Sequence, residues 1–137
     1  MAKTKYCCER YIEMLCKDYV ILRLPNIYGP NSRSVVDKFM KEDVLTIYGD
    51  GSASRTYSHV GDIVSGILAA VDWKNGLYKL GSDQNYTVLE IASQLNKPII
   101  FKDKRKGELD HSSLENTTPG WHTKIDLLTY IKNVCQN

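Results

Sequence analysis

The chain has 137 residues, enough for one hydrophobic core, and its 18 Lys and Arg residues nearly balance its 16 Asp and Glu residues. It has no basic block and no apolar run long enough to cross a membrane, so we expect a soluble, cytoplasmic protein that contacts neither nucleic acid nor membrane. Four cysteines without zinc-type or disulfide-framework spacing favour reduced, buried thiols, at Cys7, Cys8, Cys16 and Cys135.

The spacing of apolar residues alternates between the periods of a helix and of a strand. In chain order, the expected elements are a helix over 3–17, a strand over 19–24, a helix over 34–41, strands over 45–48 and 55–59, a helix over 62–73, a strand over 77–80, a helix over 87–96, a strand over 99–102 and a helix over 123–134. Alternation over the whole length predicts an α/β fold.

Local signals support several of these boundaries. Residues 25–34, PNIYGPNSRS, contain two prolines, a glycine and two asparagines, which predicts a loop of defined shape. Gly49 and Gly51 can adopt the positive φ angles of a tight turn. Thr87 and Glu90 match a capping box at the start of a helix. The strand over 19–24 is nearly all apolar, a pattern typical of a strand that is covered on both faces, although it has no obvious partner nearby.

Three sequence blocks resemble one known family. They are AKTKYCCE near the start, LRLPNIYGP at residues 22–30 and LTIYGDGSASRTYSHVGDI at residues 45–63, with weaker support from YKLGS, RKGE and PGW. The chain resembles the C-terminal part of the extended short-chain dehydrogenases, in the NAD-dependent nucleotide-sugar epimerase and dehydratase family of the UDP-glucose 4-epimerase type. This resemblance implies that residues 1–33 are a remnant of a Rossmann-like cofactor-binding domain, namely the last helix and strand of its sheet. Residues 34–137 would form the small mixed α/β nucleotide-sugar-binding domain.

The resemblance also bears on catalysis. The family uses a Tyr-x-x-x-Lys pair in which the lysine binds the nicotinamide ribose and lowers the pKa of the tyrosine. Lys5 matches this lysine as a catalytic and cofactor-binding residue, Met1 stands at the position of the tyrosine, and Pro25 would lie near the nicotinamide. The residues alone would make Lys5 an ordinary surface lysine. The resemblance implies that the complete enzyme uses NAD(P). The glycine-rich phosphate-binding turn is also missing from this chain, so we expect that the chain alone binds no NAD(P) and is inactive.

The other implied ligand is a nucleotide sugar. Guanidinium groups bind phosphate through two donors at once, and Arg55 and Arg105 match the family arginines that bind the diphosphate. The other residues implied to bind substrate are Asn26 at the diphosphate, the backbone of Leu45 and Ile47 at the base, and Val36 and Phe39 along the base pocket. From the residues alone, solvated arginines, a turn asparagine and core side chains explain the same positions equally well.

Two classes of function follow. The preferred one is the nucleotide-sugar-binding part of an NAD(P)-dependent epimerase or dehydratase that lacks its cofactor-binding half, with a UDP- or dTDP-sugar as ligand. Such a chain would be a truncated reading frame, or it would be completed by an N-terminal cofactor-binding polypeptide. The alternative is a non-catalytic nucleotide-diphosphate-binding module or an inactive fragment. The unpaired strand over 19–24 predicts a homo-oligomer, such as a dimer, and no metal site is expected.

Overall fold

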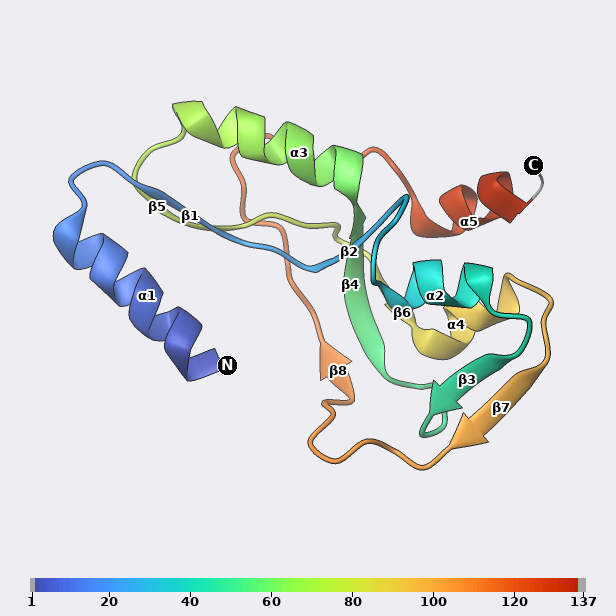
Figure 1. Ribbon diagram of the computed structural model, residues 1–137. Helices are drawn as coiled ribbons and strands as arrows, with labels where there is room; N and C mark the ends of the chain where they lie inside the picture. Colours follow the sequence, from blue (N-terminus) through green and yellow to red (C-terminus); the bar gives the residue numbers. More distant parts are fainter. Residues whose placement is uncertain (1, 136–137) are drawn as a thin grey trace.

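The computed structural model describes residues 2–135, which form helices and strands in alternation around three small sheets (Figure 1). Strand β1 (Val20–Arg23) pairs with β5 (Gly76–Lys79), and β3 (Leu45–Tyr48) pairs with β7 (Ile99–Lys102), both in parallel. The central β4 (Ser54–His59) is parallel to β2 (Asn26–Tyr28) and β8 (His111–Ser112) and antiparallel to β6 (Asn85–Thr87). The expected α/β class is confirmed, with sheets of mixed direction.

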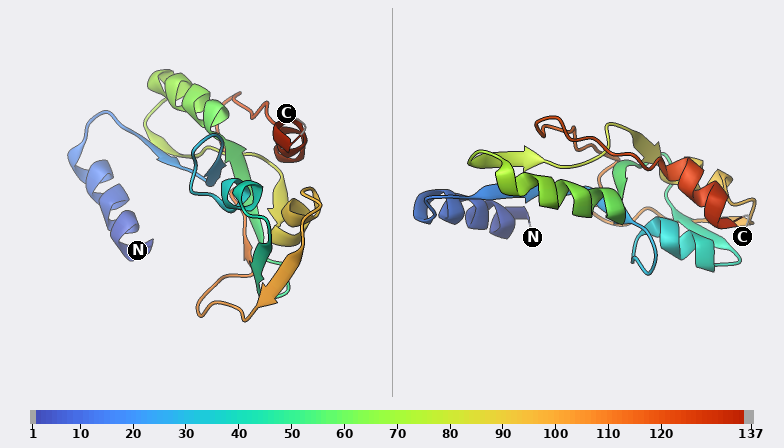
Figure 2. Two further views of the ribbon diagram at one scale, coloured as in Figure 1. Left: turned by 45° about the vertical axis from the view of Figure 1, so that its right-hand side comes forward. Right: turned by 90° about the horizontal axis from the view of Figure 1, so that it is seen from above.

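The helices divide between the two ends of the molecule (Figures 1 and 2). Helix α1 (Ala2–Leu15) and helix α3 (Val60–Ala69), which continues into the short 3-10 helix η1 (Ala70–Asp72), lie at the end that carries β1 and β5. At the other end, α2 (Val35–Lys41), α4 (Val88–Ser93) and α5 (Leu127–Cys135) surround the hydrophobic core. The core side chains are Tyr28, Val36, Phe39, Leu45, Ile47, Tyr57, Ile91, Ala92, Leu95, Leu127 and Ile131.

The N-terminal strand differs from its prediction in its burial and its pairing. Only Ile21 is buried in β1, so the strand is not covered on both faces, and it has a partner in β5. The predicted loop over 25–34 also contains β2, because extended residues after Pro25 reach the edge of β4 and pair with it. Strands β6 and β8 were not predicted, since they have only three and two residues.

Helix α3 begins at Val60 and not at the predicted residue 62, because the side chain of His59 caps it. The Nδ1 atom of His59 accepts the backbone N–H of Gly61 at 3.1 Å. Asp62 lies inside the first turn, where its Oδ2 accepts the backbone N–H groups of Lys124 and Ile125 at 3.1 and 2.9 Å. The side chain of Asp62 therefore ties the C-terminal segment to this helix. Among the apolar residues at helical spacing in α3 and η1, Ile63 and Ala70 are buried, whereas Ile67 and Val71 are exposed.

The expectation of buried cysteines is wrong, since all four are exposed. Three of them lie on or next to α1, which packs against little else within residues 2–135, so its side chains remain accessible. The division into domains at residues 33 and 34 stays a prediction. No helix in the described part of the chain is both long and apolar enough to span a bilayer.

Candidate functional site

A cleft of about 610 Å³ lies between α2, β3, β4 and the loop that follows β7. The chain after β1 contributes Pro25, Asn26 and Ile27 to its wall, the start of α2 contributes Arg33, Ser34, Val35, Lys38 and Phe39, and β3 contributes Thr46 and Tyr48. The remaining wall consists of Ala53, Arg55, Tyr57, Val88, Arg105 and Glu108. Segments distant in the sequence thus meet at one concave surface, as ligand sites commonly require.

The cleft brings together five of the residues singled out from the sequence: Pro25, Asn26, Phe39, Arg55 and Arg105. Three others do not line it, because Val36, Leu45 and Ile47 point into the hydrophobic core. In β3, alternate side chains face opposite sides, so Thr46 and Tyr48 face the cleft while Leu45 and Ile47 face the core. A contact between the β3 backbone and a base stays a prediction.

Sequence reasoning missed Arg33, Lys38, Thr46, Tyr48 and Glu108, which also line the cleft. The period of two residues in β3 could have identified Thr46 and Tyr48, since their neighbours are the apolar core residues. Nothing in the sequence distinguished the other three from solvated charges.

Arg105 lies over an aromatic ring at the cleft wall. Its guanidinium carbon is 3.9 Å from the centre of the Tyr48 ring, a cation–π contact. The hydrogen bond from Arg105, together with its positive charge, lowers the pKa of the Tyr48 hydroxyl from its ordinary value. The ring thereby supports the guanidinium beside the cleft and limits the directions in which its donors can point.

Arg55 is half-buried, and its guanidinium is held by the backbone of the loop after β7. The Nη1 atom donates to the carbonyl oxygens of Ser54 at 2.8 Å and Asp110 at 3.2 Å, and Nη2 donates to the carbonyl oxygen of Leu109. Three of the five guanidinium donors are thus engaged by backbone. Asn26 lies close by, with its Nδ2 atom 3.4 Å from the carbonyl oxygen of Thr56.

Positive charge predominates along the cleft within the described residues. Four cationic side chains line it, Arg33, Lys38, Arg55 and Arg105, against the single carboxylate of Glu108. Lys38 also lies 3.6 Å from Glu42, a distance at which an exposed pair contributes little. The Oε2 atom of Glu108 is buried and has no hydrogen-bond partner within residues 2–135. This arrangement favours an anionic ligand that also offers a hydrogen-bond donor.

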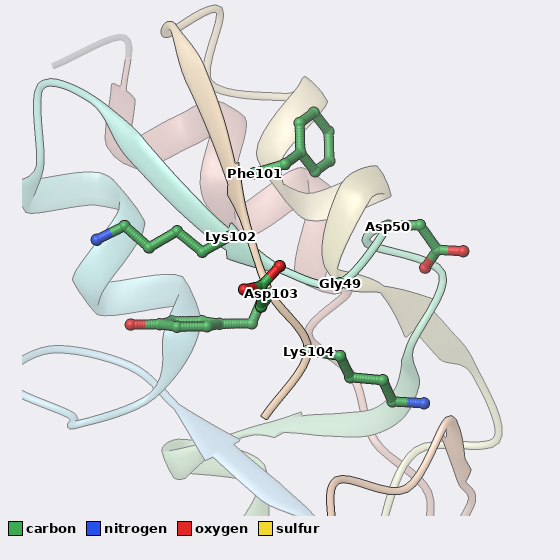
Figure 3. A pocket seen from close by; sticks show the side chains of 7 residues that line it. Gly49, Asp50, Phe101, Lys102, Asp103 and Lys104 are labelled. Carbon is green, nitrogen blue, oxygen red and sulfur yellow. The ribbon is translucent and has the colours of Figure 1, made fainter. Parts of the chain in front are cut away.

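A wider, shallow hollow of about 1050 Å³ lies beyond Tyr48 and is lined by Tyr48, Gly49, Asp50, Phe101, Lys102, Asp103 and Lys104. The side chains of Lys102 and Lys104 extend in opposite directions, and Asp103 lies between them (Figure 3). These charges do not converge on one point, so the smaller cleft with its clustered arginines is the better candidate site. No group of three or more His, Cys, Asp or Glu residues that could hold a metal ion occurs within residues 2–135.

The described residues do not fit a complete NAD site. Lys5 is exposed on α1 and does not line the cleft, and Met1 lies outside the described residues. The sequence has no G-x-G-x-x-G turn between a strand and a helix, the element that seats the cofactor pyrophosphate in such folds. Of the two residues implied to contact cofactor, Pro25 alone lines the cleft.

Comparisons with known proteins agree with this architecture. Residues 2–81 match the model of the NAD dependent epimerase/dehydratase family. A UDP-glucose 4-epimerase-like protein of Methanocaldococcus jannaschii is 32% identical, over 96% of this chain and 50% of its own length. The UDP-N-acetyl-alpha-D-glucosaminuronate decarboxylase of Bacillus cytotoxicus is 28% identical, over 94% of this chain and 46% of its own length.

Among solved structures, the UDP-glucose 4-epimerase of Thermotoga maritima, determined with UDP-glucose, superposes with a TM-score of 0.85 at 26% identity. The match covers 98% of this chain and 50% of that one. The chain therefore spans about half the length of the relatives that it matches.

Proposed function

The chain belongs to the NAD dependent epimerase/dehydratase family, and we propose from this premise that its cleft binds the nucleoside diphosphate part of a nucleotide sugar. The observation that carries the proposal is the convergence of Arg55 and Arg105, which are fifty residues apart in the sequence, on one cleft of about 610 Å³. Guanidinium groups are suited to a pyrophosphate because they offer two parallel donors. The preferred ligand is a UDP- or dTDP-sugar, and the UDP-glucose in the Thermotoga maritima structure supports the first of these.

The positions of the lining residues suggest how the ligand lies. Arg55, Arg105 and Asn26 would contact the pyrophosphate. The base would lie toward Phe39, with Thr46 and Tyr48 beside it, and the backbone of Leu45 and Ile47 within reach. The sugar would then extend toward Pro25, where the family resemblance places the nicotinamide.

We further propose that epimerase or dehydratase turnover requires cofactor-binding residues from outside residues 2–135. NAD, when bound, would supply the hydride acceptor of such a reaction. An N-terminal cofactor-binding polypeptide is the proposed source of the missing site. Within this chain, Lys5 is the residue proposed to contribute to the cofactor site. Pro25 is proposed to lie between the cofactor site and the cleft.

Calorimetry with the purified chain tests the binding proposal. We expect UDP-glucose and UDP to bind and free glucose to give no heat, because the arginines contact the diphosphate. Arg105→Gln should weaken the binding of UDP about tenfold or more, as expected for the loss of a charge-assisted hydrogen bond. Arg10→Gln is the matched control, because Arg10 is exposed on α1, where it pairs with Glu13. If none of the UDP-, dTDP-, GDP- and CDP-sugars binds, the proposal is wrong.

A second candidate function is a binding module without turnover. The position of Lys5, exposed on α1 and away from the cleft lining, favours it. Mixing the chain with a cofactor-binding polypeptide of the family and NAD distinguishes the two candidates. Turnover of UDP-glucose that appears only in the mixture would support the split enzyme, whereas binding without turnover in any mixture would support the module.

A further inference from the structure

The loop between β7 and β8, residues 103–110, forms one wall of the cleft, and few contacts hold it in place. Its residues from Asp103 to Gly107 are all exposed. A Cβ atom added to Gly107 would meet nothing within 4 Å, so the tip of the loop stands clear of the body. Within the loop, Lys104 pairs with Asp110, and the N–H of Glu108 donates to the carbonyl oxygen of Arg105 at 3.2 Å. These internal contacts shape the loop but do not attach it to the sheet.

Two contacts attach the loop to the body: the Arg105 guanidinium lies over the Tyr48 ring of β3, and the last residues of the loop are bound by β4. The backbone N–H of Ser54 donates to the carbonyl oxygen of Asp110 at 2.8 Å, and Arg55 donates to the carbonyl oxygens of Asp110 and Leu109. The pairing of β4 with β8 begins immediately afterwards, where Ser54 lies opposite His111. Arg55 is therefore the side chain that fixes the last residues of the loop before the strand begins.

A guanidinium is suited to this task in a way that an ammonium is not. Its planar fork has five donors, so three can bind carbonyl oxygens while two remain for another partner, whereas an ammonium has three donors in all. Three donors of Arg55 are engaged by Ser54, Leu109 and Asp110, and the same side chain lines the cleft. Arg55 can thus bridge the loop and a bound anion.

We propose that Arg55 is a positioning residue that fastens the 103–110 loop over the cleft, so that the contact of Arg105 with Tyr48 and the position of Glu108 both depend on Arg55. The proposal rests on the proposed function, because the loop then closes on a pyrophosphate. This role goes beyond contact with the phosphate, because loss of Arg55 would also remove the contribution of Arg105 to pyrophosphate binding.

Limited trypsin digestion without ligand tests the fastening. The loop contains Lys104, Arg105 and Lys106, three cleavage sites whose products mass spectrometry identifies. In Arg55→Lys, we expect cleavage at these sites to be about tenfold faster than in the unmodified chain, because the open state of the loop becomes more populated. Arg10→Lys keeps every trypsin site and should leave the rate unchanged. Hydrogen exchange at core amides such as those of Leu45 and Ile91 checks that Arg55→Lys still folds. Its exchange rates at these amides should equal those of the unmodified chain. An unchanged loop cleavage rate in a folded Arg55→Lys would overturn the proposal.

A double-mutant cycle with UDP as the probe tests the coupling. If Arg55 acts through the loop, Arg105→Gln weakens UDP binding about tenfold in the unmodified chain but less than about twofold in Arg55→Lys. If Arg55 contacts only the phosphate, the two effects add, and the proposed positioning role is wrong. An unmodified chain that binds no UDP would overturn the proposed function together with this coupling. The ligand-free digestion would then still decide whether Arg55 fastens the loop.

Discussion

Lys97 holds together the C-terminal end of α2. Its ammonium donates to the backbone carbonyl oxygens of Phe39, Met40 and Glu42 at 3.1, 2.8 and 2.7 Å, and the side chain is half-buried. The last carbonyls of a helix have no partner within it, so a cation that binds three of them stabilises the helix end and its dipole. Because α2 forms one wall of the cleft, Lys97 also stabilises an element of the candidate site.

We expect Lys97→Met to lower the free energy of unfolding by about 2–3 kcal/mol, since three carbonyl groups lose a charged donor. Urea denaturation followed by circular dichroism measures this change. Lys38→Met on the same helix is the matched control, because Lys38 makes only an exposed pair with Glu42 at 3.6 Å and should cost less than about 0.5 kcal/mol. Equal losses in the two variants would contradict the role given to Lys97.

At the scale of a single element, α4 begins with a capping box whose strength depends on pH. Glu90 accepts the backbone N–H and the hydroxyl of Thr87 at 2.7 and 2.8 Å, and Thr87 in turn accepts the N–H of Glu90 at 3.1 Å. The backbone hydrogen bond from Thr87, and then that of its hydroxyl, lower the pKa of Glu90 from its ordinary value. A lowered pKa in the folded state means that the charged carboxylate stabilises the fold.

This stabilisation is fully present above the ordinary glutamate pKa of about 4.3 and is lost as the pH falls through the lower folded-state pKa. Glu90→Gln should therefore destabilise the chain at neutral pH, and the difference from the unmodified chain should shrink as the pH falls below about 4.3. Urea denaturation over this pH range measures the difference. Glu115→Gln, at an exposed position, should show no such trend. A constant penalty for Glu90→Gln at every pH would rule out the charged cap.

The same elements show how much the sequence could predict. The capping box at Thr87 and Glu90 was identified correctly, because it depends only on residue type and local spacing. Strand β2 was missed, because Pro25 and Gly29 indicate a loop and only the edge of β4 makes the residues between them a strand. The presence of Arg55 and Arg105 in one cleft was expected only through the family resemblance. The bonds from Arg55 to Leu109 and Asp110 could not be foreseen, since they depend on where two distant backbone segments meet.

For the whole molecule, the ends of two helices away from the cleft expose apolar side chains. Met14 and Leu15 on α1 are 77% and 78% exposed, and Leu68 and Val71 at the end of α3 and in η1 are 67% and 79% exposed. Both helices lie at the end that carries β1 (Figure 2), and β1 has a paired strand on one edge only within the described residues. An apolar surface beside an open strand edge commonly becomes an interface.

We therefore expect the chain to self-associate through this end, where β1 is paired with β5 and its other edge is open within the described residues. Light scattering after size-exclusion chromatography should give a mass that rises toward the dimer with concentration. Leu68→Lys should raise the dissociation constant about tenfold or more, because burial of a leucine side chain contributes about 1.5–3 kcal/mol. The same substitution at Leu89, which is 41% exposed on α4 at the other end, should leave the mass profile unchanged. A monomer at the highest attainable concentration would show that the chain tolerates this surface without a second copy, and that the inference from the strand edge is wrong.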